Sequence, residues 1–131
     1  KKNIKIFYNL NNDEVIRLMR KNDFSIGSGG INLTERLFLS LPSIVISNAS
    51  NQIRAIKALK DKKLIYYLGS HKKVSMALIK KSLSKFINNE KLFLELRKRV
   101  NLAYDGKTQY NLFSSQLNHL LVKKNLTVWQ S

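Results

Sequence analysis

The chain is predicted to be an α/β protein with a Rossmann-like, three-layer fold, in which a parallel sheet of about four strands is followed by C-terminal helices. Short apolar runs alternate with amphipathic segments over residues 1–69, which is the pattern of β-α repeats. Helical segments alone follow over residues 74–122. At 131 residues and 44% apolar composition, the chain is predicted to form one domain, residues 1–131, with its own core.

Four apolar runs are predicted to be the strands of this sheet. They are residues 4–8, 24–26, 43–47 and 64–68. The first run alternates weakly, and the others are short and continuous, as expected for buried parallel strands. Pro42, the one proline of the chain, comes just before the third run, where a missing N–H group does little harm.

The helices are predicted from apolar residues that recur at intervals of three and four. Three of them, residues 14–20, 32–40 and 51–60, follow the first three strands, and the Asn11-Asn12-Asp13 sequence can cap the first of these helices. Three more, residues 74–86, 89–103 and 110–122, form the C-terminal part. The Asp105-Gly106 pair predicts a turn before the last helix.

The charge is strongly positive, with 24 Lys and Arg against 8 Asp and Glu, a net charge of +16. Such a chain attracts polyanions, anionic lipid or small anions. The lysines are scattered along the helices, however, and form no arginine-aromatic cluster, so no specific nucleic-acid partner is expected. Solvated helix faces and a peripheral contact with an anionic membrane both stay open.

Composition also limits the chemistry and the location. With no cysteine, disulfides, thiolate zinc sites and cysteine nucleophiles are excluded, and no metal site or cofactor is expected. No apolar run approaches the roughly 20 residues of a membrane span, and no signal peptide is recognisable, so a cytoplasmic location is expected. The chain opens at Lys1-Lys2 without an initiator Met. We therefore expect it to be part of a longer protein.

The turn Gly27-Ser28-Gly29-Gly30 is the first candidate site, because it joins a strand to a helix. A helix that starts after small residues presents free N–H groups to a phosphate, and the hydroxyl groups of Ser28 and Thr34 can add donors. The alternative is a tight turn that needs positive φ angles and binds nothing. The spacing fits neither the dinucleotide fingerprint nor a P-loop.

Three further positions are candidates on the same side of the sheet. Glu35 can bind a ribose diol from the following helix, or it can form a capping box with Asn32. Asn51 and Gln52 follow the third strand, where open α/β folds bind ligands, but they also fit an ordinary helix start. His71 follows the last strand, and a solvated loop histidine is the default interpretation there.

Taken together, these residues resemble the C-terminal, nucleotide-binding domain of GT-B glycosyltransferase-like proteins. The similarity is to the UDP-sugar hydrolases of pseudaminic acid biosynthesis and, more distantly, to the transferases that add N-acetylglucosamine to the lipid-linked peptidoglycan precursor. It covers most of the chain. Its motif residues are Asp23, Ile26-Gly27, Gly30, Glu35-Arg36, Leu41-Pro42-Ser43 and Asn51-Gln52.

The resemblance implies that this chain is the UDP-binding part of a hydrolase that releases UDP from a UDP-diacetamido-trideoxy sugar. It assigns the diphosphate to the glycine turn and helix start, and the ribose to Glu35. It assigns the uracil to the backbone near Ile46 and Ser47, and it places Asn51 close to the reacting centre and Gln52 beside the nucleotide. A UDP-sugar-dependent transferase domain and a non-catalytic, polyanion-binding module are the alternatives.

The same resemblance implies that parts of the enzyme are missing. GT-B active sites lie between two domains, so the N-terminal domain of the same protein is an expected partner and this chain alone is expected to be inactive. In the sheet of this family, two further strands lie side by side between those that correspond to residues 4–8 and 24–26, and the resemblance implies that this chain lacks both. A homodimer, a swapped strand, or residues 4–8 pairing directly with residues 24–26 would each satisfy the sheet edge.

Overall fold

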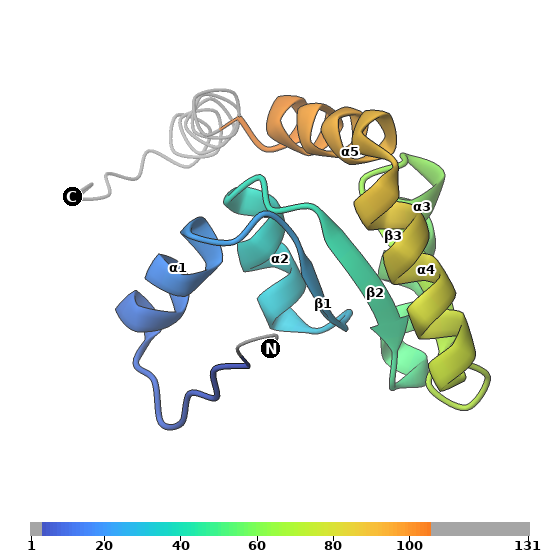
Figure 1. Cartoon of the computed structure of the whole chain (residues 1–131), viewed down its shortest axis with the longest axis horizontal. Coiled ribbons are helices and arrows are strands. Elements are labelled where there is room, and N and C mark those ends of the chain that lie inside the picture. The colour runs from blue at the N-terminus through green and yellow to red at the C-terminus, as the bar shows by residue number, and fades with distance from the viewer. Residues whose placement is uncertain (1–3, 106–131) are drawn as a thin grey trace, which may run out of the picture.

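The structure, a computed structural model, describes residues 4–105, which form an α/β fold (Figure 1). Three strands, five α-helices and one 3-10 helix lie within these residues. In chain order they are α1 (Asn12–Arg20), β1 (Ser25–Ser28), α2 (Ile31–Phe38), β2 (Ser43–Ser47), the 3-10 helix η1 (Ser50–Gln52), α3 (Ile53–Asp61), β3 (Tyr66–Ser70), α4 (Met76–Asn88) and α5 (Glu90–Ala103).

The sheet is parallel, and its strands lie side by side in the order β1-β2-β3. Ser25 pairs with Ser43, and Ile44 pairs with Tyr66. The register of β2 against β3 shifts after Val45, so that Ile46 lies opposite Gly69. Gly69 has a φ angle of 132°, a conformation that side chains rarely allow, so glycine is required at this irregularity.

Helices cover both faces of the sheet. On one face, Arg36 of α2 lies against Gly27, and Ile56 of α3 packs beside Val45 and Gly29. On the other face, Phe86 of α4 contacts Tyr66, with ring centroids 6.1 Å apart. The predicted α/β architecture is therefore confirmed as a parallel sheet between helices.

The core is made by the buried residues of this sandwich. The fully buried apolar side chains come from α2, β2 and the residue before it, α3, α4 and α5, and they are Leu37, Pro42, Ile44, Val45, Ile56, Phe86 and Val100. Phe86 is central to the aromatic part of the core, because the rings of Phe24 and Phe93 pack edge-on against it at 5.3 and 5.9 Å. The C-terminal helices thus belong to the same core as the sheet.

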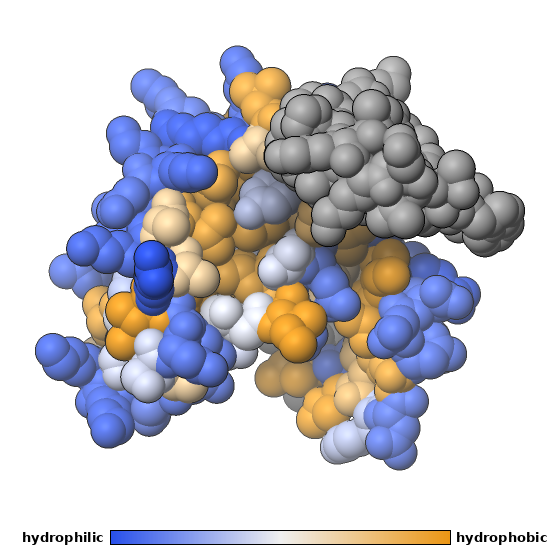
Figure 2. Space-filling model, turned by 180° about the vertical axis from the view of Figure 1, so that it is seen from behind, coloured by the Kyte–Doolittle hydropathy of each residue, from blue (hydrophilic) through white to orange (hydrophobic). Residues whose placement is uncertain are grey.

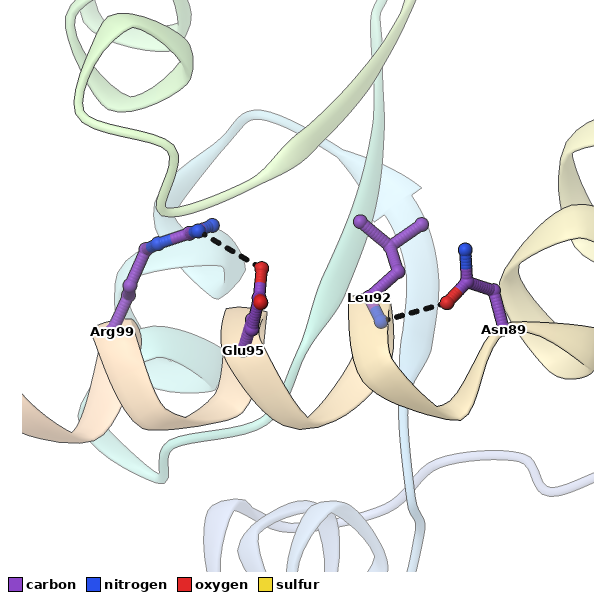
Figure 3. Close-up of polar contacts among 4 residues, drawn as sticks. All are labelled: Asn89, Leu92, Glu95 and Arg99. Carbon is purple, nitrogen blue, oxygen red and sulfur yellow. Dashed lines mark hydrogen bonds and ion pairs between the residues drawn. The ribbon is translucent and has the colours of Figure 1, made fainter.

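Helix α5 lies across the amino ends of the strands (Figure 1). Near its end, Tyr104 packs against Phe38 at 5.3 Å, and Asn101 accepts a hydrogen bond of 3.0 Å from Ser40, just before β2. Its own start is capped by Asn89, whose side chain accepts from the N–H group of Leu92 (Figure 3). The carboxyl ends of the strands, at the opposite edge, remain available for a site.

One ion pair on α5 follows the helical spacing of four residues. Glu95 and Arg99 are 3.2 Å apart, and both side chains are more than a third exposed (Figure 3). Such an exposed pair adds about 0.3–0.5 kcal/mol to helix stability.

The prediction of a strand over residues 4–8 is wrong. This segment is irregular and pairs with no strand in the described part of the chain, and Ile4, Ile6 and Tyr8 are 85, 68 and 77% exposed. The physical reason is that no described strand lies beside this segment to pair with it. After it, Asn9 has a φ angle of 49°, which ends the extended run, and Asn11 caps α1 through a capping box with Glu14. The described sheet therefore has three strands rather than four.

Other predicted elements are present with shifted ends. The last strand lies at Tyr66–Ser70 rather than 64–68, because Lys63 adopts a left-handed conformation after α3 and Leu64 and Ile65 are buried before pairing begins. The helix predicted over residues 51–60 is divided into η1 and α3. The helix predicted over residues 110–122, and Gly106 of the predicted turn, lie outside the described residues.

Some apolar surface remains exposed. Seen from behind, the centre of the molecule shows apolar atoms between polar margins (Figure 2). Several large apolar side chains are more than half exposed, including Ile31, Phe38 and Met76. Within residues 4–105, every helix is too short or too polar to cross a lipid bilayer.

Candidate functional site

The candidate site lies at the carboxyl ends of β1 and β2, where the glycine turn leads into α2. Gly30 is the N-cap residue of α2, and no side chain caps this helix. The N–H group of Leu33 donates to the carbonyl of Gly30, but those of Ile31 and Asn32 have no hydrogen-bond partner in the described part of the chain. Two free N–H groups at a helix start favour an anion.

The three glycines of the turn differ in what surrounds them. A methyl group on Gly29 would lie 2.7 Å from Cγ1 of Ile56, and one on Gly27 would lie 3.0 Å from Nη1 of Arg36. Gly29 is thus needed for close packing, whereas a methyl group on Gly27 would require only a small shift of the Arg36 side chain. A methyl group on Gly30 would make only ordinary van der Waals contacts, since the nearest atoms would be 3.6 Å away or more. Gly30 is therefore the least crowded glycine of the turn.

The alternative of a turn that needs positive φ angles is wrong for this segment. Among the glycines of residues 4–105, Gly69 alone has a positive φ. Gly30 has φ −79° and ψ −161°, which is ordinary extended backbone. Small size, rather than left-handed conformation, is what the turn requires.

The Glu35 side chain does not cap α2 and is therefore available to contact a ligand. Because α2 starts at Ile31 after Gly30, the predicted capping box of Asn32 with Glu35 is not formed. The Glu35 carboxylate is exposed and has no hydrogen bond or ion pair within residues 4–105. Thr34 is exposed as well. Both side chains are free to contact a ligand that lies along α2.

The structure brings Gln52 to the glycine turn. Its Oε1 accepts from the N–H group of Asn48 at 3.3 Å, and its Nε2 would lie 3.6 Å from a methyl group on Gly30. Ser28 Oγ lies on another side of the same position, at 3.9 Å. Ser28, Gly30 and Gln52, predicted from separate parts of the sequence, therefore surround one point.

Asn51 is exposed in η1, and its side chain makes no hydrogen bond in the described structure. The alternative that Asn51 caps an ordinary helix start is wrong, since neither η1 nor α3 has a side-chain cap. Asn51 is thus free for another role, although nothing in residues 4–105 directs its amide toward Gly30.

Ile46 and Ser47, the predicted uracil contacts, are partly used by the fold. The hydroxyl of Ser47 shares a hydrogen bond of 2.8 Å with that of Tyr67, and the carbonyl of Ser47 accepts from the N–H group of His71 at 2.8 Å. Ile46 is half-buried on the face opposite to Ser47. Only part of the expected backbone surface is therefore open.

A hollow lies between the loops that follow β2 and β3. It has a volume of about 300 Å³, and its lining includes Ser47, Asn48, Ser70, His71 and Lys72. The exposed His71 lies here, as its place after the last strand predicts. Lys72, the cation beside it, was missed by sequence reasoning, because a lysine in a basic chain carries no local signal.

Arg36, next to Glu35 in the sequence, is buried, with 5% of its surface exposed. Its guanidinium donates to the carbonyl of Asn32 at 3.1 Å, to Oγ of Ser25 at 3.3 Å and to the carbonyl of Ser28. Burial lowers the pKa of Arg36 from its ordinary value, because the charged form is removed from water. Arg36 thus holds the end of β1 against α2.

No metal centre accompanies these residues: residues 4–105 contain no group of three or more His, Asp and Glu side chains that could hold an ion. Comparison with known proteins found no matching protein-family model, no matching curated protein and no matching solved structure. The candidate site is therefore defined by its own geometry.

Proposed function

We propose that this chain is the UDP-binding part of a nucleotide-sugar hydrolase, acting on a UDP-diacetamido-trideoxy sugar. The observation that carries the proposal is the start of α2, where the N–H groups of Ile31 and Asn32 follow Gly30 and have no hydrogen-bond partner within residues 4–105. This is the arrangement that binds phosphate at the carboxyl end of a parallel sheet. The sugar and the hydrolase activity rest on the family resemblance.

In the proposed complex, the diphosphate lies at Gly30, with the Ser28 hydroxyl and the Gln52 amide as further donors. The ribose diol donates to the unpartnered carboxylate of Glu35, one turn along α2, near Thr34. The uracil lies toward the end of β2, at Ile46 and Ser47. A neutral amide and hydroxyl beside a helix start suit a diphosphate, which accepts hydrogen bonds through all its oxygens.

The proposed reaction breaks the bond between the anomeric carbon and the diphosphate oxygen. Water supplies the new oxygen on the sugar, and UDP leaves with its charge stabilised by the helix start. Asn51, exposed and unpartnered at the sheet edge, is the proposed residue near the reacting carbon. The N-terminal domain of the same protein would complete the site, and the reaction would take place in the cytoplasm.

Calorimetry with UDP on the full chain of 131 residues tests the nucleotide site. Glu35→Ala should weaken UDP binding about tenfold, since it removes two hydrogen bonds to a charged acceptor. Glu90→Ala, which removes an exposed first-turn carboxylate of α5, is the matched control and should bind UDP as the wild type does. Equal affinity in all three proteins would remove Glu35 from the site, and absence of binding would refute the nucleotide proposal.

The enzyme class needs a separate measurement. The chain alone should release no UDP from the diacetamido-trideoxy substrate above the level of a boiled control, whereas the chain joined to its N-terminal domain should release it by adding water. Transfer of the sugar to an acceptor hydroxyl by the complete protein would assign the transferase alternative instead.

A polyanion-binding module is the second candidate, favoured by the net charge of +16. Its binding would not distinguish UDP from other anions and would weaken steeply with salt. Titrations of UDP, pyrophosphate and a duplex oligonucleotide at 50 and 200 mM salt separate the two functions. A preference for UDP over pyrophosphate at both salt concentrations supports the nucleotide site.

A further inference from the structure

The outer face of α5 carries large apolar side chains where a solvated helix would carry polar ones. Leu94 and Leu102 are 51 and 69% exposed, whereas Leu96 of the same helix is buried. Positions 91, 94, 98 and 102 follow one another at intervals of three and four residues, so they form one stripe along the helix. The two leucines of this stripe alternate with Lys91 and Lys98, which are exposed as well.

The surface around this stripe is positively charged. Basic residues outnumber acidic ones on α5. Along one flank of the helix, between α5 and the end of α3, lies a hollow of about 200 Å³, and its lining includes Lys60, Lys63 and Arg99. Arg99 pairs with Glu95, but neither Lys60 nor Lys63 forms an ion pair within residues 4–105. Both lysines are exposed and therefore free to bind an anion.

This surface belongs to the amino edge of the sheet, because α5 crosses the amino ends of the strands (Figure 1). The proposed nucleotide site, and the N-terminal domain expected beside it, belong to the opposite, carboxyl edge. The two further strands that the family resemblance implies would extend the sheet beside β1. The hollow lies at the other side of the sheet, against β3, whose first residue Tyr66 lines it. None of these expected parts would therefore cover the surface.

We propose that the outer face of α5 is a contact surface for an anionic lipid bilayer, in which Leu94 and Leu102 enter the boundary between the headgroups and the acyl chains. Lys91, Lys98 and the cations of the adjoining hollow bind the lipid phosphates. Nucleic acid also attracts a chain with a net charge of +16, but exposed leucines gain nothing from a phosphate backbone. Leucines beside lysines are typical of helices that lie in a membrane interface. The inference does not depend on UDP binding.

Vesicle flotation with the full chain of 131 residues tests the role of the leucines. At about 150 mM salt, the chain should float with vesicles of phosphatidylcholine that contain about 30% phosphatidylglycerol, and much less of it with pure phosphatidylcholine. Leu94→Ser/Leu102→Ser should reduce binding to the anionic vesicles about tenfold, since it removes the side chains that enter the interface. The matched control is Ile53→Ser/Met76→Ser, which changes residues 48 and 67% exposed at the starts of α3 and α4 and should bind like the wild type.

The role of the charges is tested with paired substitutions of lysine by glutamine. Each of two pairs should reduce binding to the anionic vesicles about tenfold, because a lysine near the surface attracts anionic lipid: Lys91→Gln/Lys98→Gln on α5 and Lys60→Gln/Lys63→Gln at the hollow. Lys72→Gln/Lys73→Gln removes the same charge beyond the carboxyl end of β3 and should bind like the wild type.

A fluorescent label locates the contact. Because the chain has no cysteine, one introduced cysteine can carry an environment-sensitive fluorophore. The emission of the label on Leu102→Cys should shift to shorter wavelengths when anionic vesicles are added, whereas that of the label on Met76→Cys should not change. A shift at neither position, or an equal shift at both, would overturn the insertion of α5.

The proposal is also overturned if the chain does not float with anionic vesicles, or if Leu94→Ser/Leu102→Ser floats as the wild type does. A dimer in light scattering that this variant dissociates would assign the stripe to a second copy. A lower melting temperature of the variant without vesicles would show that the chain itself covers the leucines. Tighter binding of a duplex oligonucleotide than of anionic vesicles would assign the lysines to nucleic acid. Each of these three results contradicts a membrane contact.

Discussion

The side chain of Ile56 fills the space beside Gly29. Helix α3 can approach the glycine turn this closely because position 29 carries no side chain. The contact joins the turn before α2 to the helix after β2, and Val45 lies next to it at 3.6 Å from a methyl group on Gly29. Gly29 is thus a packing position of the glycine turn.

Gly29→Ala should lower the free energy of unfolding by about 1–3 kcal/mol, because the added methyl group would overlap Ile56. Gly30→Ala, the control, adds a methyl group where the nearest atoms are 3.6 and 3.9 Å away, and should change stability by less than about 1 kcal/mol. Urea denaturation measures both. In the double variant with Ile56→Val, which removes the terminal methyl group of Ile56, the two losses should be less than additive. Full additivity would refute the contact.

Arg36→Lys should lower the free energy of unfolding by about 1–3 kcal/mol. A lysine keeps the charge but not the planar group that reaches Ser25, Ser28 and Asn32 together. Arg54→Lys on exposed α3 should change stability by less than about 0.5 kcal/mol. Thermal unfolding compares the variants, and equal melting temperatures would show that the three hydrogen bonds add nothing.

The lowered pKa of Arg36 has a definite consequence for pH dependence. In the folded state the pKa lies below its value in the unfolded state, so the cost of burying the charge persists at every pH below the folded pKa. Stability can rise from this group only as alkaline pH passes the folded pKa. The stability difference between wild type and Arg36→Met, which has no titrating group at this position, should therefore be constant from pH 5 to pH 9 in urea denaturation, and a slope in that range would contradict this assignment.

Tyr67→Phe should cost about 1 kcal/mol of stability, because it leaves the buried hydroxyl of Ser47 without its 2.8 Å partner. Tyr66→Phe is the control: the Tyr66 hydroxyl has no hydrogen bond within the described residues, and its loss should cost less than about 0.5 kcal/mol. Denaturation curves of the two variants decide. A loss for Tyr66→Phe as large as that for Tyr67→Phe would contradict a specific role of the Ser47–Tyr67 hydroxyl pair.

Asn11→Ala should loosen α1 without unfolding the domain. It removes the N-cap bond of 3.0 Å to the Glu14 N–H group, worth about 1 kcal/mol, from a helix that buries none of its residues completely. Amide hydrogen exchange in α1 should accelerate about fivefold, while the melting temperature stays the same. Asn12→Ala, one residue later and without a capping bond, should leave exchange unchanged. A parallel fall in melting temperature would mean that α1 is part of the core.

Sequence periodicity predicted the β-α order and the C-terminal helices through α5, because repeating apolar positions dominate local structure there. The same reasoning failed for residues 4–8, since an alternating run looks identical whether or not a partner strand exists. The convergence of Ser28 and Gln52 on Gly30 followed from their places after neighbouring parallel strands. The burial of Arg36 and the contact of Gly29 with Ile56 could not be predicted, since both depend on how helices from distant segments sit on the sheet.

The strand order β1-β2-β3 means that each strand pairs with the next one along the chain. Ser25 meets Ser43 and Ile44 meets Tyr66, so each pairing closes a loop that contains little more than one helix. Loops of this size cost less entropy to close than those between strands that are distant in the sequence. The domain can therefore assemble in chain order, one β-α unit at a time, as the polypeptide leaves the ribosome.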